Sequence, residues 1–214
     1  MGGKCLLYIV SLFVLIYFCV SFLQQTLCER QLRMEGKIYL VPIDKIEDKI
    51  VGALVNQIEN TFNRKVEIHR SMKIPPDAYN QMRSQYLSTN ILRRLRYSTK
   101  PLREEKVLGI ADVDLYVKGL NFVFGEAELG GNFAIISLAR LRESFYSLPE
   151  NETLFLERAI KEAVHEIGHL YELRHCDRPD CVMYFSNSLR DTDRKSTSFC
   201  SKCRELLDNL QLFQ

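Results

Sequence analysis

The sequence predicts a mixed α/β fold, in which helices pack on a sheet of parallel and antiparallel strands. Short β-rich runs alternate with amphipathic helical segments, and further β-rich runs then precede a last long helix. The 214 residues are 46% hydrophobic and 26% charged, which is typical of a globular domain rather than a disordered or fibrous chain. We therefore expect one domain over residues 34–214, preceded by a hydrophobic segment over residues 1–33.

The first half of the domain is expected to contain two strands and two helices. Residues 37–43 form a β-rich run, and Asp44 is a candidate cap for a helix whose apolar residues recur every four positions up to Phe62. Residues 66–69 predict a second strand. Residues 77–97 predict a second helix, whose arginines we interpret as a solvated face rather than a docking patch.

The second half adds three strands and the last long helix. Residues 107–117 form an almost continuous apolar run, typical of a strand buried on both faces of a sheet. Residues 122–124 and 133–137 predict the next two strands. Asn151 precedes a helix that we expect to run to about residue 173. The sequence thus predicts a five-stranded mixed sheet with three main helices.

The charge balance argues against nucleic-acid binding. The chain has 29 basic and 27 acidic residues, a net charge of +2. The first 33 residues hold three of the basic and one of the acidic residues, which leaves 26 of each in residues 34–214. A neutral body lacks the basic stripe that a phosphate backbone requires, so we expect no nucleic-acid partner.

The last long helix carries the strongest chemical signal. His165, Glu166 and His169 form an H-E-x-x-H motif. Residues four apart lie one turn apart on the same helix face, so both imidazoles can bind one tetrahedral zinc ion. Glu166 lies beside that metal, where it can accept a proton from an activated water. The motif therefore predicts a catalytic zinc site for amide hydrolysis, with Glu166 as general base.

His175 is the favoured third ligand of this site. In the longer motif H-E-x-x-H-x-x-G-x-x-H a glycine turns the chain toward the metal, but here Glu172 occupies that position. A non-glycine residue in the left-handed region costs roughly 1–2 kcal/mol, which metal binding can offset. An alternative stays open: if the helix continues, Glu172 lies one turn beyond His169 and could bind the metal through its carboxylate.

Four cysteines follow in the pattern C-x4-C-x18-C-x2-C. The close pair at its end is typical of a zinc knuckle, and four thiolates saturate a tetrahedral ion with no open position. We therefore expect a second, structural zinc ion, giving two zinc ions per chain. Two disulfides are the alternative, and they would require an oxidising compartment. The four residues are Cys176, Cys181, Cys200 and Cys203.

Together these motifs resemble the archaemetzincins, a branch of the metzincin zinc peptidases. The resemblance is specific because other metzincins lack the four cysteines, and it covers nearly all of residues 37–210. Glu172 and the N-terminal hydrophobic segment depart from the family pattern. Besides the metal motifs, the similar segments are residues 108–116, 121–127, 136–141 and 185–188.

The resemblance implies a metzincin-like domain with a zinc-bound C-terminal subdomain below a cleft. It implies three histidine ligands on the catalytic zinc and four cysteine ligands on the second zinc. It also implies that Met183 lies beneath the catalytic metal. Residues 122–127 would form the edge strand to which a peptide substrate adds by backbone hydrogen bonds; an ordinary buried strand is the alternative for this segment.

We expect a monomeric peptidase that hydrolyses peptides or small proteins. The alternative function is a membrane-tethered zinc-binding module with little or no turnover, which binds a partner in its cleft. The intact Glu166 argues against this alternative, whereas Glu172 in place of the motif glycine argues for it.

Residues 5–23 form an apolar run that predicts a membrane helix. At 1.5 Å per residue the run nearly spans a hydrocarbon core of ~30 Å, and no A-x-A cleavage site follows it. Lys4 alone precedes the run, whereas three basic residues follow it up to Lys37, which favours a single-pass protein with a cytoplasmic catalytic domain. If Met34 is the true start, the protein is soluble and cytoplasmic.

The anchor can be tested by fractionation. Full-length protein should stay with membranes after carbonate extraction, whereas residues 34–214 alone should remain in the supernatant. The sequon at Asn151 tests the orientation in a eukaryotic host, because only a translocated domain would be glycosylated there. A glycan at Asn151 would reverse the orientation assigned here.

Overall fold

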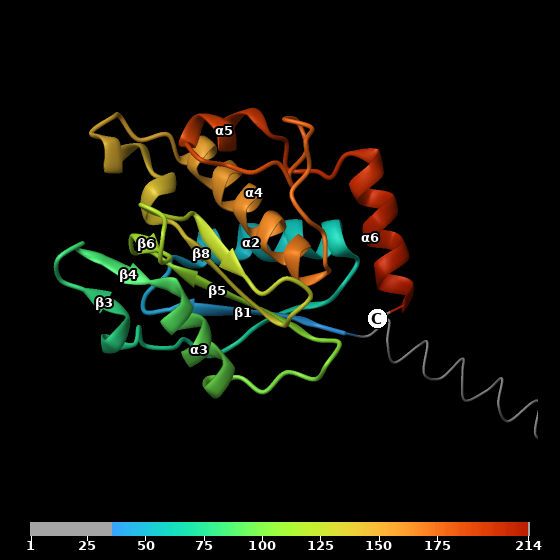
Figure 1. The fold of residues 1–214 in the computed structure, drawn as a ribbon, viewed down its shortest axis with the longest axis horizontal. Helices are drawn as coiled ribbons and strands as arrows, with labels where there is room; N and C mark the ends of the chain where they lie inside the picture. The colour runs from blue at the N-terminus through green and yellow to red at the C-terminus, as the bar shows by residue number, and fades with distance from the viewer. Residues whose placement is uncertain (1–35, 214) are drawn as a thin grey trace, which may run out of the picture. The chain divides into compact units, whose positions relative to one another are not determined.

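The computed structural model describes residues 36–213 (Figure 1). The predicted hydrophobic segment, with its membrane helix at residues 5–23 and the alternative start at Met34, lies outside the described residues. Among residues 36–213, no helix combines the length and the apolar character needed to cross a membrane.

A five-stranded mixed sheet forms the centre of the domain, as predicted. Its strand order is β2-β1-β5-β8-β7, and only β7, at one edge, runs antiparallel to its neighbour. The strands are β1 (Ile38–Ile43), β2 (Val66–Ile68), β5 (Lys106–Ala111), β7 (Gly125–Ala127) and β8 (Phe133–Ser137).

Helices cover both faces of this sheet (Figure 1). Helices α2 (Asp48–Phe62) and α4 (Glu152–Leu170) pack on one face, and α3 (Ser88–Ser98) packs on the other. Successive side chains of a strand point to opposite faces. Accordingly, Leu108 and Ile110 of β5 join the apolar cluster under α2 and α4, whereas Val107 and Ala111 join the cluster under α3. Burial of such a side chain stabilises the fold by about 1.5–3 kcal/mol.

The prediction of one helix over residues 77–97 is wrong for its first half. A 3-10 turn, η1 (Pro76–Ala78), leads into strands β3 (Tyr79–Asn80) and β4 (Gln85–Leu87), and α3 begins only at Ser88. Strand β4 pairs with β6 (Leu115–Tyr116), so β3, β4 and β6 form a second, three-stranded sheet. Pairing with a distant segment thus overrides the local preference for helix.

The predicted strand over residues 107–117 is also divided, because the chain leaves the main sheet after β5. Asp114 accepts two hydrogen bonds from Arg140, at 2.6 and 2.8 Å, and β6 then joins the second sheet. The predicted strand over residues 122–124 is not formed. Val123 makes an isolated bridge to Leu115, and pairing with β8 starts only at Gly125.

The ends of the helices differ from the predictions in two places. Asn151 caps α4 as its position suggests, because its side chain accepts a hydrogen bond from the Leu154 amide at 3.1 Å. The helix ends at Leu170, three residues before the predicted end near residue 173. Asp44 does not cap α2; it adopts a φ of 57° in the turn before it, and Glu47 directly precedes the helix.

Two further helices, absent from the sequence prediction, lie in the C-terminal region. They are α5 (Leu189–Arg194) and α6 (Ser201–Phe213). Helix α6 packs on α2: Arg204 donates to the Thr61 carbonyl at 2.8 Å, and Leu207 is completely buried.

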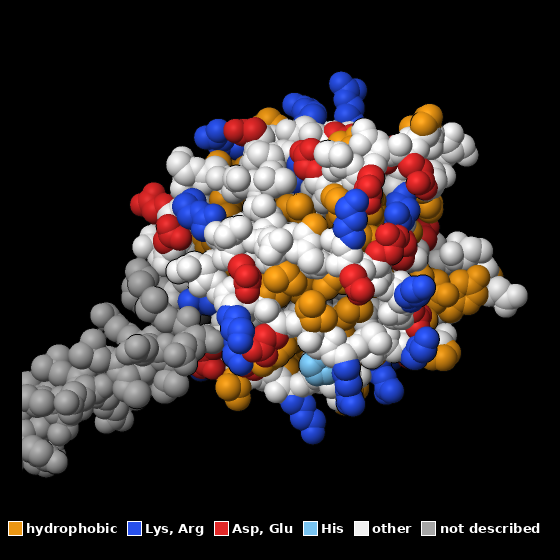
Figure 2. Space-filling view, turned by 180° about the vertical axis from the view of Figure 1, so that it is seen from behind, with side chains coloured by type: hydrophobic (Ala, Val, Ile, Leu, Met, Phe, Trp, Pro, Cys, Tyr) orange, Lys and Arg blue, Asp and Glu red, His pale blue; other side chains and the backbone are white. Residues whose placement is uncertain are grey.

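The surface carries charges of both signs. On the face opposite to that of Figure 1, basic and acidic side chains are interspersed, with apolar side chains between them (Figure 2). This pattern matches the equal numbers of basic and acidic residues in residues 34–214.

Candidate metal centres

Three histidines converge at the C-terminal end of α4. His165 and His169 lie one turn apart on this helix, and their Nε2 atoms are 3.1 Å apart. His175, in the loop that follows, places its ring centroid 5.3 Å from that of His165 and 4.9 Å from that of His169. One nitrogen from each ring lies within 4.8 Å of the others. The structure thus brings together the three histidines that the sequence singled out.

Backbone carbonyls fix the tautomers of the two helix histidines. Nδ1 of His165 lies 2.8 Å from the Val182 oxygen, and Nδ1 of His169 lies 2.7 Å from the Leu173 oxygen. A carbonyl oxygen only accepts, so each Nδ1 donates and each neutral ring keeps a lone pair on Nε2. Two lone pairs facing each other at 3.1 Å repel unless a cation lies beside both. This donor set therefore fits a metal ion.

Burial keeps these rings uncharged. It lowers the pKa of His165 well below its usual value and that of His169 to about 4, and it also lowers the pKa of His175. Only an uncharged imidazole can bind a metal, so the three rings are in the ligand form at neutral pH.

The turn after α4 explains how Glu172 replaces the motif glycine. The Leu173 amide donates to the Gly168 oxygen at 3.1 Å, and the Glu172 amide donates to the His169 oxygen at 3.0 Å. These two bonds define a Schellman motif, in which Glu172 takes the left-handed position with a φ of 65°. The helix therefore does not continue, and among the described residues Glu172 does not join the histidine cluster. Its side chain instead packs beside Gly130.

A later part of the loop after α4, residues 182–183, supports the histidines. Met183 is completely buried, and a Cβ atom on Gly168 would lie 2.6 Å from its sulfur. The glycine inside the H-E-x-x-H motif thus lets this loop pack directly against α4. The same loop supplies the Val182 oxygen that orients His165. Neither contribution can be predicted from the sequence, since neither a glycine inside a helix nor a backbone carbonyl has a distinctive spacing.

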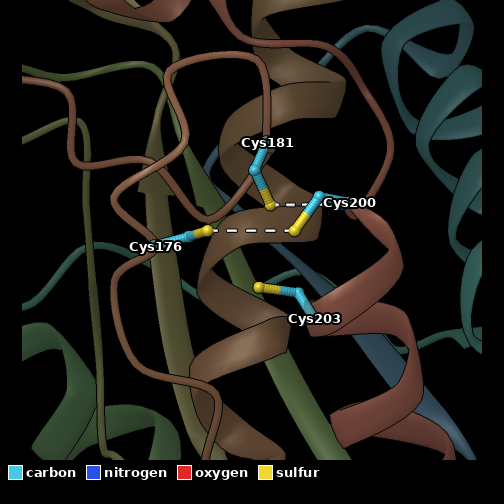
Figure 3. Close-up of side chains that lie close together, drawn as sticks. All are labelled: Cys176, Cys181, Cys200 and Cys203. Atoms are coloured by element: carbon cyan, nitrogen blue, oxygen red, sulfur yellow. Dashed lines mark hydrogen bonds between the residues drawn. The ribbon is translucent and has the colours of Figure 1, made fainter.

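The four cysteines form a second cluster (Figure 3). Cys176 and Cys181 lie in the loop after α4, whereas Cys200 and Cys203 lie at the beginning of α6. Their sulfur atoms all lie within 4.8 Å of one another, and none forms a disulfide. Such convergence on one point fits a tetrahedral ion better than two separate disulfide pairs, in which the sulfurs would be ~2 Å apart.

The helix start favours the thiolate form of one cysteine. Although burial raises it, the pKa of Cys200 is lowered to about 7 by the Cys203 amide and by the neighbouring thiols. Burial raises the pKa of Cys181 and of Cys203. A bound cation would offset the cost of burying these thiolates, because metal ligation favours the thiolate form.

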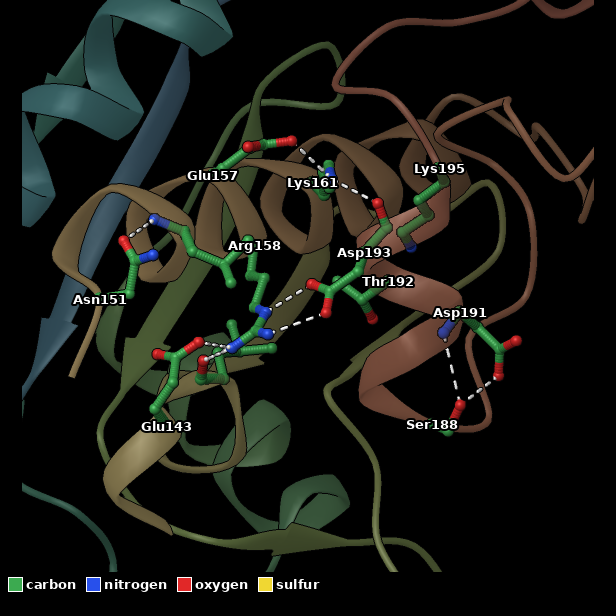
Figure 4. Close-up of polar contacts among 12 residues, drawn as sticks. Glu143, Asn151, Glu157, Arg158, Lys161, Ser188, Asp191, Thr192, Asp193 and Lys195 are labelled. Atoms are coloured by element: carbon green, nitrogen blue, oxygen red, sulfur yellow. Dashed lines mark hydrogen bonds and ion pairs between the residues drawn. The ribbon is translucent and has the colours of Figure 1, made fainter. Parts of the chain in front are cut away.

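Buried ion pairs hold α5 against α4 (Figure 4). Arg158 binds both oxygens of Asp193, at 2.6 and 2.8 Å, and also donates to Glu143 at 2.6 Å. Lys195, which is completely enclosed, lies 3.0 Å from Glu162. These contacts fix the chain just after residues 185–187, which line the cleft. The sequence gives no signal for them, because the paired residues come from different segments.

The histidines open into a cleft of about 240 Å³. Glu166 lines this cleft together with the histidines and is 5% exposed. Burial, with a smaller contribution from the nearby carboxylate of Glu162, raises the pKa of Glu166 well above its usual value. All of β7, Phe122 and Phe124 also line the cleft.

Comparisons with known proteins agree with this architecture. The model of peptidase family M54 matches residues 33–209. The archaemetzincin of Methanocaldococcus jannaschii is 45% identical over 177 residues, which are 83% of this chain and 96% of that protein. The crystal structure of archaemetzincin from Archaeoglobus fulgidus, complexed with malonate, superposes with a TM-score of 0.69 at 42% identity over 79% of this chain and 99% of that chain. The Methanopyrus kandleri structure gives 0.73 at 38% identity over 83% and 96%.

Proposed function

The chain belongs to peptidase family M54, the family of the archaemetzincins, and is a zinc metallopeptidase; from this we propose which of its residues hydrolyse the peptide bond. The observation that carries the proposal is that Glu166 lines the same open cleft as the uncharged histidines His165 and His169. We assign His165, His169 and His175 as ligands of the catalytic zinc. A zinc ion in such a site polarises the substrate carbonyl and lowers the pKa of a water toward ~7.

Glu166 acts as the proton carrier in this proposal. Its carboxylate accepts a proton from the attacking water and later delivers it to the leaving amine. Because the side chain belongs to the same helix as two of the ligands, α4 fixes base and ligands together.

The edge strand β7 supplies the substrate-binding surface. One side of the strand pairs with β8, and all three of its residues line the cleft. An extended peptide can add to such an edge through backbone hydrogen bonds. This mode suits peptides and flexible segments of small proteins, and we propose that the enzyme acts on them as a monomer.

The four cysteines hold a second, structural zinc in this proposal. Four thiolates leave no position open for water or substrate. The site would tie the loop after α4 to α6, and Cys176 is the direct neighbour of the ligand His175. Its role is therefore to hold the third ligand in place.

Two zinc ions of unequal lability are expected per chain. The three-histidine site has an open position, so a chelator should remove its ion first and activity should be lost in that fast phase. Metal release followed with a chromogenic chelator, beside total zinc by mass spectrometry, checks this. Cys200→Ser/Cys203→Ser should lack the slow phase. One zinc ion per fully reduced chain would contradict the proposal.

The activity itself is tested with a mixed peptide library. Purified protein should cleave a subset of the peptides, as detected by mass spectrometry, and removal of the labile zinc should stop cleavage. Zinc added back should restore it. Cleavage that survives removal of this zinc would contradict the assignment of the histidine site.

A further inference from the structure

Gly125 lies directly opposite the Glu166 carboxylate. It is the first residue of β7, and alternation along the strand places positions 125 and 127 on the side of α4. Consistent with this, Ala127 packs against the apolar cluster that includes α4, whereas Glu126 points the other way and accepts hydrogen bonds from Ser88 and Thr89 of α3.

There is no room for a side chain at this glycine. A Cβ atom on Gly125 would lie 2.5 Å from Oε1 of Glu166, 2.6 Å from its Cγ and 2.7 Å from its Cδ. The three nearest atoms all belong to the one side chain that is proposed to carry the proton. The backbone of Gly125 is not left-handed, so space alone, and not conformation, restricts this position.

The strand is held too firmly to move away from such a contact. Residues 125–127 pair with β8, and the ladder is extended by the bond from the Ser137 amide to the Phe124 oxygen at 2.7 Å. On the far side, the Glu126 carboxylate is bound to two hydroxyl groups of α3. The Glu166 carboxylate, in contrast, is the end of a flexible side chain. Added bulk at residue 125 would therefore displace the carboxylate rather than the strand.

We propose that Gly125 is a positioning residue for hydrolysis: its missing side chain leaves the space in which the Glu166 carboxylate meets the attacking water. The inference rests on the proposed role of Glu166 and adds a second requirement, that the residue of the edge strand at this point has no side chain. Displacement of a reacting group by about 1 Å can cost about 10²-fold in rate.

Gly125→Ala in the full-length, zinc-loaded protein tests the proposal. We expect kcat for a cleaved peptide to fall about 10²-fold, with KM and zinc content unchanged. Gly52→Ala is the matched control, since Gly52 is exposed on α2 and a Cβ there meets no atom within 4 Å. The control should keep full activity. A rise in KM with unchanged kcat in Gly125→Ala would show that the glycine makes room for substrate instead, and would overturn the proposal.

A stability cycle tests the same contact without using activity. Glu166→Ala removes all three atoms that the new Cβ would approach. In that background, Gly125→Ala should leave the denaturant midpoint unchanged and the protein folded, even if Gly125→Ala alone folds poorly. An equal fall of the midpoint in both backgrounds, or failure of the double variant to fold where Glu166→Ala folds, would show that the strand itself rejects the methyl group and would overturn the inference.

The outcomes also separate the two proposals. Full activity of Glu166→Gln would reject Glu166 as the base, and the positioning role with it. An inactive Glu166→Gln beside a fully active Gly125→Ala would leave the base in place and reject only the role of Gly125.

Discussion

Glu166→Gln is expected to lower kcat for peptide hydrolysis by at least about 10²–10⁴-fold while both zinc ions stay bound. Glutamine preserves the size of the buried side chain in the wall of the cleft but cannot accept the proton of the attacking water. Glu166→Ala should lose activity to a similar extent. Steady-state kinetics on one cleaved peptide, with zinc measured on the same preparations, checks the prediction.

A second glutamate of α4 provides the control. Glu157 lies on the same helix, its side chain is 48% exposed, and it pairs with Lys161 at 2.7 Å outside the cleft. Glu157→Gln should therefore keep its activity. Loss of zinc from Glu166→Gln would point to a ligand rather than a base, and unchanged turnover in this variant would reject the proposed mechanism.

The two clusters of candidate metal ligands could be predicted because their signals are local. Two histidines four residues apart on a helix must lie on one face, whatever the rest of the fold. The left-handed conformation of Glu172 was also expected, since its place in the motif requires the chain to turn. The family resemblance then placed Met183 below the histidines, and the structure shows it buried against Gly168.

The elements that the sequence did not predict depend on distant partners. Strand β4 forms because β6, which is separated from it by α3 and β5, pairs with it, so local helix preference was misleading. The ion pairs around Arg158 and Lys195 join segments that are far apart along the chain. Helix α6 had a usable signal, because Cys203, Leu207 and Leu210 recur at helical spacing.

His175→Ala is expected to lower the zinc affinity of the histidine site by more than about 100-fold. Loss of a ligand should lower this affinity more than loss of a hydrogen bond to a ligand, which costs about 10–100-fold. The four-cysteine site should keep its zinc. Competition with a chelator of known affinity, followed separately for the fast and slow phases of release, measures both sites in one experiment.

Glu172→Gly should keep both zinc ions and activity, because Glu172 ends the helix without joining the histidine cluster. Relief of the left-handed strain favours the variant by about 1–2 kcal/mol, whereas the flexibility of glycine in the unfolded chain costs about 0.5–1 kcal/mol. Burial lowers the pKa of Lys106, and Glu172 is the strongest of the charges that oppose this effect. Loss of the attraction between Glu172 and Lys106 further reduces the stabilisation gained from strain relief. We therefore expect the free energy of unfolding to change by less than about 1 kcal/mol.

Two further variants separate backbone strain from charge at this turn. Asparagine tolerates the left-handed region, so Glu172→Asn should relieve much of the strain but lose the attraction for Lys106. Ser147→Gly measures strain relief and the flexibility cost of glycine without a change of charge, since Ser147 has a similar φ of 58° directly after η3 (Glu143–Tyr146). If Glu172→Gly lost the labile zinc while His175→Ala kept it, the carboxylate would be the third ligand. We expect the opposite: Glu172→Gly keeps the labile zinc and His175→Ala loses it. The reason is that the Schellman motif ends the helix before Glu172 can face the metal.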